Sequence, residues 1–220
     1  MALDDRQLEA YAAGRRREER AESYATKYDR ELHKRISSFF ERRAIRRALA
    51  IAGVHDARVL DVPCGAGRLT PLLEPASSLL VSCDYSPAML HQFRRARGKP
   101  CFVGSAFDLP FADRTFDVVF SARLSHHIES DARRADYLRE ILRISERAVI
   151  VTIFDRHSLK NRLREVSRRL SGKRSKHTFA RADVERIAGA SGFAVAASLP
   201  LSRLMSGHVF YVLQRKGQAR

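Results

Sequence analysis

Short runs of apolar residues alternate along the chain with longer segments in which apolar and polar positions recur at helical spacing. This alternation is typical of repeated βαβ units. Near-continuous apolar runs, such as Val149 to Val151, are expected in a parallel sheet that helices cover on both faces. Seven runs are predicted to be strands: 58–62, 79–83, 100–103, 116–120, 148–154, 193–199 and 208–214. Helices are predicted at about 69–73, 87–97 and 131–145, the second with Ser86 and Pro87 as N-cap and first-turn residues.

The first fifty residues are also predicted to be mostly helical. Their apolar side chains recur at helical spacing, which indicates packing against the core: Leu32, Ile36, Phe39, Phe40, Ile45 and Leu49. Ahead of this stripe, residues 15–20 mix basic and acidic side chains and suit an exposed or poorly ordered helix. With 45% hydrophobic content, 220 residues suffice for one α/β core and are few for two. We expect a single domain over 1–220, in which 1–52 form a helical N-terminal extension and cap.

The composition is strongly basic, with 41 Lys and Arg against 25 Asp and Glu and a net charge of +16. Such a charge attracts nucleic acid, anionic lipid surfaces or acidic small molecules, and solvated Arg-rich helix faces account for it equally well. No apolar run approaches the ~18 residues of a membrane span, and the first twenty residues are charged, which predicts a cytoplasmic protein. The three cysteines lack the paired spacing of a zinc site, so free thiols and no metal are expected.

The highest density of positive charge lies between the fifth and sixth predicted strands. Residues 155–190 are predicted to be a basic helical insertion near the substrate site, and within 156–176 only Glu165 opposes the basic side chains. Apolar residues recur there at helical spacing, as in an amphipathic helix that could contact an anionic membrane surface or cover a groove. A solvated helix docked on the domain is the simpler alternative.

The first predicted strand turns through two glycines, Gly65 and Gly67, into a helix. Two nearby glycines let the main chain approach a ligand, and the helix start offers backbone N–H donors to a carboxylate or phosphate. A dinucleotide-binding fingerprint would place a third glycine at position 70, where this chain has Thr70. The turn therefore disfavours a nicotinamide cofactor.

Three acidic residues follow or end the first three strands. Asp84 ends the second strand, where its carboxylate could accept hydrogen bonds from both ribose hydroxyls of an adenosine. Asp108 follows the third strand, where it could accept from an adenine amino group, and Asp61 precedes the glycine turn. Each has a simpler alternative: Asp61 could stabilise the turn, Asp84 could cap the next helix and Asp108 could cap a turn. Together the three acids could bracket one nucleoside.

These segments resemble the class I S-adenosylmethionine-dependent methyltransferases, particularly the small-molecule branch that includes ubiquinone and menaquinone biosynthesis enzymes. The resemblance runs from Arg58 to the C-terminus and is carried by Leu-Asp-Val-Pro-Cys-Gly-Ala-Gly (60–67), Cys-Asp-Tyr-Ser-Pro-Ala-Met-Leu (83–90), Asp-Leu-Pro-Phe-Ala-Asp-Arg-Thr-Phe-Asp (108–117) and Ser-Gly-Phe (191–193). It implies a Rossmann-like α/β fold whose seven-stranded, mostly parallel sheet has the order 3-2-1-4-5-7-6, with the last strand antiparallel and helices on both faces.

The resemblance also implies S-adenosyl-L-methionine as cofactor, with Met89 against its adenine. The cofactor-binding residues that it implies are Asp61, Pro63, Gly65, Gly67, Asp84, Tyr85, Met89, Phe107, Asp108 and Ser121. Pro63 is a departure, because the family usually has glycine there and proline fixes φ and removes an N–H donor. The backbone of the glycine turn must therefore adopt a conformation that accommodates proline at this position.

His126 and His127 follow the fourth strand, where the family places the wall between cofactor and substrate. Attack on a sulfonium methyl requires the acceptor to lose a proton, and imidazole titrates near neutral pH, so either histidine could be the general base. Packing against the cofactor or capping of the next helix is the alternative. His177 is a second candidate. The Asn/Asp-Pro-Pro-aromatic motif of adenine-N6 methyltransferases is absent from this position.

The sequence therefore predicts methyl transfer to a small-molecule or lipid-linked acceptor by direct in-line displacement. One alternative is an RNA-directed methyltransferase, which the charge permits, although the chain lacks Trp and its six Tyr are not clustered. Another is a non-catalytic binding protein that kept the fold, for which Pro63 and the absence of an assured base are the hints.

Overall fold

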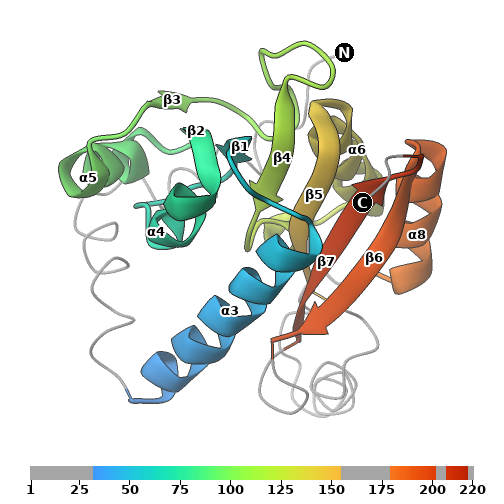
Figure 1. The fold of residues 1–220 in the computed structure, drawn as a ribbon, viewed down its shortest axis with the longest axis horizontal. Helices are drawn as coiled ribbons and strands as arrows, with labels where there is room; N and C mark the ends of the chain where they lie inside the picture. Colours follow the sequence, from blue (N-terminus) through green and yellow to red (C-terminus); the bar gives the residue numbers. More distant parts are fainter. Residues whose placement is uncertain (1–31, 155–178, 202–206, 218–220) are drawn as a thin grey trace.

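A seven-stranded sheet forms the centre of the computed structural model, which describes residues 32–154, 179–201 and 207–217. The strands are β1 (Ala57–Asp61), β2 (Ser77–Asp84), β3 (Cys101–Val103), β4 (Phe116–Ser121), β5 (Ser145–Phe154), β6 (Phe193–Pro200) and β7 (His208–Arg215). They follow the order β3-β2-β1-β4-β5-β7-β6. The first five pair in parallel, and β7 lies antiparallel between β5 and β6 (Figure 1). The predicted fold class and strand order are confirmed.

Helices cover both faces of this sheet. They are α3 (Leu32–Ile51), α4 (Thr70–Leu73), α5 (Pro87–Arg97), α6 (Asp131–Arg143) and α8 (Arg181–Ala190), with short 3₁₀ turns η1 (Glu74–Ala76) and η2 (Ser125–His127). Alternate strand residues point to opposite faces. Val118 and Ile150 pack with side chains of α3 and α4, whereas Val119 and Val149 pack with side chains of α6 and α8. Two apolar layers therefore enclose the central strands, which explains their near-continuous apolar sequences.

Local sequence signals set the bounds of α5. The hydroxyl of Ser86 accepts a hydrogen bond from the Met89 N–H at 3.3 Å, and Pro87 occupies the first turn. At the other end, Gly98 adopts φ +61° and its N–H donates to the Arg94 carbonyl. This left-handed C-cap favours glycine because other residues are strained there. The predicted N-cap and the predicted range 87–97 are confirmed.

Helix α3 runs at an angle to the strands and ends near the start of β1 (Figure 1), and only part of it packs on the core. Ile45 and Leu49 are buried, and the Gln214 side chain on β7 donates to the Ile51 carbonyl at 3.0 Å. Phe39 and Phe40 are 64% and 43% exposed, so the prediction that they pack in the core is wrong. In Figure 1 this stretch of α3 extends past the end of the sheet, where no strand lies beneath it. Helical spacing alone does not reveal where the supporting surface ends.

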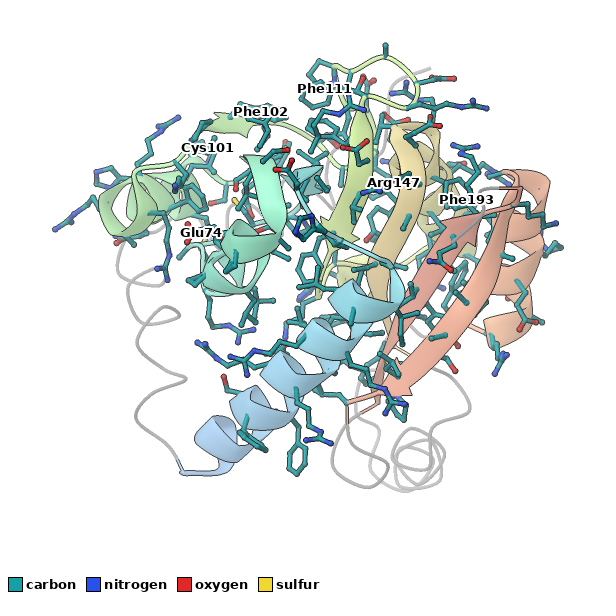
Figure 2. All side chains as sticks on the ribbon, in the orientation of Figure 1. Glu74, Cys101, Phe102, Phe111, Arg147 and Phe193 are labelled. Carbon is teal, nitrogen blue, oxygen red and sulfur yellow. The ribbon has the colours of Figure 1, made fainter. Side chains whose placement is uncertain are left out.

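Aromatic side chains close the end of the sheet beside β3 and the start of β4. Phe111, in the connection before β4, packs edge-on against Phe102 at 5.5 Å and against Phe116 at 4.9 Å between ring centroids. Figure 2, which labels Phe102 and Phe111, shows side chains filling the space between the sheet and its helices. The opposite ends of the parallel strands, their carboxyl ends, are where the candidate site lies.

Several predicted features lie outside the described residues. These are the polar stretch 15–20, the basic segment 156–176 and His177. Within the described part of the chain, no helix combines the length and apolar character that a membrane span requires.

Candidate functional site

The turn after β1 is built from backbone hydrogen bonds to the neighbouring strands. The Val62 N–H donates to the Phe120 carbonyl on β4 at 3.0 Å, and the Cys64 N–H donates to the Cys83 carbonyl on β2 at 2.8 Å. The Val62–Pro63 peptide bond is cis. These contacts hold the turn over the carboxyl ends of β1, β2 and β4, the edge at which open α/β sheets bind ligands.

The two glycines of this turn have different surroundings. Gly65 has φ +56°, and a Cβ atom added there would meet no atom within 4 Å. Gly67 has φ +77°, and an added Cβ would lie 2.8 Å from the ring of Phe93 and 2.9 Å from Cγ of Arg97, both on α5. Both conformations favour glycine, but Gly65 faces open space and Gly67 allows the turn to pack against a helix.

Asp84 is oriented by backbone donors from two segments. Its Oδ2 accepts from the Gly65 N–H and its Oδ1 accepts from the Ser86 N–H, each at 2.8 Å. The residue is 5% exposed. Because each carboxylate oxygen can accept more than one hydrogen bond, these contacts orient the group and are compatible with bonds from a vicinal diol. The simpler alternative for Asp84 was a role in capping the next helix, and its hydrogen bond from Ser86, the N-cap residue of α5, is similar to that role. Asp84 therefore both orders the start of α5 and lines the site.

Asp61 lies behind this turn and is buried. Thr70 donates to its Oδ2 at 3.4 Å. Burial raises the pKa of Asp61 to about 8, and the nearby Asp84 carboxylate adds to the increase. Asp61 is therefore largely protonated at neutral pH, so that it can donate as well as accept a hydrogen bond.

Two adjoining cavities open at this edge of the sheet and share Pro63 and Asp84. The larger has a volume of about 210 Å³ and is lined by Asp61, Pro63, Cys64, Gly65, Ala66, Arg68, Leu69, Asp84, Met89, Ala122, Arg123, His126 and His127. The smaller, about 20 Å³, is lined by Val62, Pro63, Asp84, Tyr85, Gly104, Ser105, Ala106, Phe107 and Leu124. Polar and cationic side chains gather in the larger cavity, and mostly apolar ones in the smaller. Asp84 stands where the two meet.

Most of the predicted cofactor residues therefore lie together, and three lie apart from the cavity linings. Gly67 packs against α5, and its carbonyl accepts from the Arg97 side chain at 2.9 Å. Ser121 is fully buried, where its hydroxyl donates to the Val62 carbonyl and is hydrogen-bonded to the Tyr137 hydroxyl. Asp108 is exposed, and its backbone N–H donates to the Ser105 carbonyl at 3.2 Å. Their assignment to the cofactor stays a prediction.

His126 and His127 both line the larger cavity, with ring centroids 4.0 Å apart. The ring of His126 also contacts His208 at 4.8 Å and Phe154 at 5.9 Å. His208 was not predicted. It reaches this group because β5 and β7 pair antiparallel with Phe154 opposite His208, a register that the sequence does not reveal.

The larger cavity also contains two arginines that were not predicted. Arg68 follows the glycine turn, Arg123 follows β4, and each forms a 2.7 Å ion pair with Glu41 of α3. Burial raises the pKa of Glu41, but the two arginines outweigh burial and hold this pKa below its ordinary value. The sequence shows only that both arginines lie near the recognised motifs. It does not indicate that they pair with an acidic residue on a distant helix.

The cysteines are free thiols, as expected, with Cys64 and Cys83 buried. Burial raises the pKa of the Cys83 thiol to about 12 and that of Cys64 further still. Neither thiol supplies a thiolate nucleophile at neutral pH. Among residues 32–154, 179–201 and 207–217, no group of three or more His, Cys, Asp and Glu side chains could hold a metal ion.

Residues 60–152 match the family model described as a methyltransferase domain. These residues therefore belong to a class I S-adenosylmethionine-dependent methyltransferase domain. The matched segment of the methyltransferase domain contains the glycine turn, Asp84, both arginines and His126 with His127. Glu41 and His208, which contact these cavity residues, lie outside the matched segment.

Relatives of the methyltransferase domain differ in the acceptors that their names specify. A demethylmenaquinone methyltransferase of Corynebacterium kroppenstedtii is 38% identical over 87 residues, which cover 40% of this chain and 36% of that protein. A protein of Bos taurus named as tRNA methyltransferase 9B is 31% identical over 86 residues, which cover 39% of this chain and 18% of that protein. The match thus spans well under half the length of either relative.

Among solved structures, magnesium protoporphyrin IX methyltransferase from Synechocystis with bound S-adenosylmethionine has a similar fold. The TM-score is 0.72 at 14% sequence identity, and the likeness covers 98% of this chain and 99% of that chain. At this identity the likeness concerns the fold alone.

Proposed function

We propose that the chain transfers a methyl group from S-adenosylmethionine to a small-molecule or lipid-linked acceptor by direct in-line displacement. The single observation that carries the proposal is the position of Asp84. Its carboxylate stands where the two cavities meet and is oriented by the N–H groups of Gly65 and Ser86.

The residues present fit this cofactor. A carboxylate at the junction suits a ribose diol, and the smaller cavity offers the adenine a mostly apolar lining that includes Tyr85 and Phe107. Gly65 leaves open space next to Asp84, so that a ligand can approach the backbone. The larger cavity then accommodates the amino-acid end beside Arg68 and Arg123.

When bound, the cofactor supplies an electrophilic methyl group on a positively charged sulfur. The contribution of this chain is mainly to orient, because holding two reactants in line and close together can supply much of a rate acceleration. Asp84 and the turn hold the nucleoside end, and the wall of Arg123, His126 and His127 borders the remaining space. An imidazole of His126 or His127 accepts the acceptor's proton where the acceptor is a hydroxyl or acidic carbon.

The proposal is tested by methyl transfer from S-adenosylmethionine carrying a tritiated methyl group. Purified protein is incubated with hydroquinones, aromatic carboxylic acids and isoprenoid lipids, and the incorporated label is counted for wild type and Asp84→Ala. Asp117→Asn is a matched control, since Asp117 is an acid ion-paired to Arg58 at the amino ends of β1 and β4. Label transferred by wild type and Asp117→Asn but lost in Asp84→Ala supports the proposal. A folded wild type that binds no S-adenosylmethionine contradicts it.

RNA is a second candidate acceptor, favoured by the net charge of +16 and by the tRNA methyltransferase 9B relative. Contacts to phosphates release counterions, so RNA affinity should fall steeply with salt concentration. Label in tRNA with no label in the small-molecule panel would replace the small-molecule proposal with this one.

A further inference from the structure

Glu41 joins three segments of the chain at the wall of the larger cavity. It lies on α3 and is 1% exposed, and its two carboxylate oxygens pair with different arginines. Oε2 lies 2.7 Å from Nη1 of Arg68, and Oε1 accepts from Nε of Arg123 at 2.7 Å. One buried carboxylate thus fixes the side chains of two residues that line the cavity.

Arg123 is held at its backbone as well as at its side chain. It has φ +64°, a left-handed conformation that is uncommon for residues other than glycine. Its N–H donates to the Thr152 hydroxyl on β5. A residue keeps a sparsely populated conformation only where its surroundings over-determine it, and such positions cluster at ligand sites. The direction of the Arg123 side chain is therefore set from α3 and from β5 together.

The guanidinium groups of Arg68 and Arg123 are chemically complementary to a carboxylate. A guanidinium presents its donors in a rigid fork that matches carboxylate geometry, and binding there depends on the fork's orientation. Asp84, which suits the nucleoside, lines the same cavity as Arg68 and Arg123. A ligand that extends from Asp84 along the larger cavity would bring a charged end group to the arginines.

We propose that Glu41 is a positioning residue that holds Arg68 and Arg123 so that their guanidinium groups bind a ligand carboxylate. This inference rests on the proposed function and deepens it. The carboxylate has two sources, the amino-acid end of the cofactor or an acidic group on the acceptor. Helix α3, outside the matched segment, is thereby part of the binding site.

The first arm of the test compares two nucleosides by calorimetry. S-adenosylhomocysteine carries the amino-acid carboxylate, and 5′-methylthioadenosine lacks it. Arg123→Met is expected to weaken S-adenosylhomocysteine about 10-fold and to leave 5′-methylthioadenosine unchanged, as expected for loss of one charged hydrogen-bonding group. An unfolded variant would lose both ligands, so 5′-methylthioadenosine binding also reports on folding.

Glu41→Gln distinguishes positioning from simple attraction. Removal of the negative charge makes the surroundings of Arg68 and Arg123 more positive, so electrostatic attraction alone predicts tighter binding of S-adenosylhomocysteine. Positioning predicts weaker binding, because one amide oxygen cannot hold two guanidinium groups. Glu41→Asp, which keeps the charge on a shorter side chain, should lie between wild type and Glu41→Gln. Asp117→Asn, which removes the acid paired with Arg58 at the far end of the sheet, should change neither ligand.

The second arm examines the acceptor as the source. With S-adenosylhomocysteine saturating, benzoate and its neutral counterpart benzamide are titrated into wild type, Glu41→Gln and Arg123→Met. If benzoate binds where benzamide does not, and both variants lose this binding, then the two arginines bind the carboxylate of an acidic acceptor. Tighter S-adenosylhomocysteine binding in Glu41→Gln, or no response to either variant in both arms, overturns the inference while the proposed function stands. A wild type that binds neither nucleoside overturns the proposed function and this inference with it.

Discussion

The two ends of the larger cavity are built in different ways. At the nucleoside end, backbone N–H groups of Gly65 and Ser86 hold the Asp84 carboxylate, and all three residues lie within 22 positions of one another. At the far end, side chains hold side chains, and Glu41 reaches Arg123 across 82 positions. The first end is a local structure of one βαβ unit, whereas the second exists only after distant segments have packed.

This difference suggests which parts of the site are common to relatives and which belong to this chain. The nucleoside end falls entirely inside the matched segment 60–152. The far end depends on Glu41 and has His208 packed behind His126, and both lie outside that segment. We therefore expect the residues of the far end to determine which acceptor is methylated, and those of the nucleoside end to contribute most of the affinity for the cofactor.

The largest expected effect is at the nucleoside end. Asp84→Ala removes both acceptors for the ribose diol and should weaken S-adenosylhomocysteine about 100-fold or more, since hydrogen bonds to charged groups are worth about 1.5–3 kcal/mol each. Asp84→Asn keeps one oxygen and should lose about 10-fold. Calorimetry measures both, and thermal unfolding confirms that each variant is folded. Equal affinities for wild type and Asp84→Ala would show that the nucleoside binds elsewhere.

The two glycines sharpen the comparison within that end. Gly67→Ala should lower the free energy of unfolding by about 2–3 kcal/mol, because the added Cβ clashes with α5 at a left-handed φ. Gly65→Ala should cost only about 1 kcal/mol for its left-handed φ, but its methyl group enters the larger cavity and should weaken S-adenosylhomocysteine. Urea denaturation and calorimetry separate the two effects. A greater loss of stability in Gly65→Ala than in Gly67→Ala would contradict this account of the turn.

The buried Asp61 should make the stability of the protein depend on pH. Its folded-state pKa of about 8 lies above its ordinary value of 3.8, so the folded protein binds a proton that the unfolded chain releases. The stabilisation from this proton is complete below about pH 4 and is lost as the pH rises through about 8. Asp61→Asn removes the titration, so the Tm of wild type should fall relative to that of Asp61→Asn between pH 5 and 8. Parallel Tm profiles would indicate that Asp61 is ionised throughout this range.

The same division, between local structure and contacts of distant segments, separates the features that the sequence predicts from those that it does not. All seven strands and the capped helix α5 were predicted, because periodicity and capping are local properties. Asp84, Gly65 and the histidine pair line one cavity, and the sequence could place them together because each follows or ends one of three adjacent parallel strands. The exposure of Phe39 and Phe40 was not predicted, since it depends on where the sheet ends beneath α3. Glu41 and His208 were missed for a related reason: their partners are set by helix packing and by the β5–β7 register.

The most direct test of the central claim is a crystal structure of the chain with S-adenosylhomocysteine. We expect both ribose hydroxyls to donate to the Asp84 carboxylate, the adenine to lie beside Tyr85 and Phe107, and the homocysteine end to lie in the larger cavity. A nucleoside bound away from Asp84, or an adenine in the larger cavity among the arginines and histidines, would contradict it.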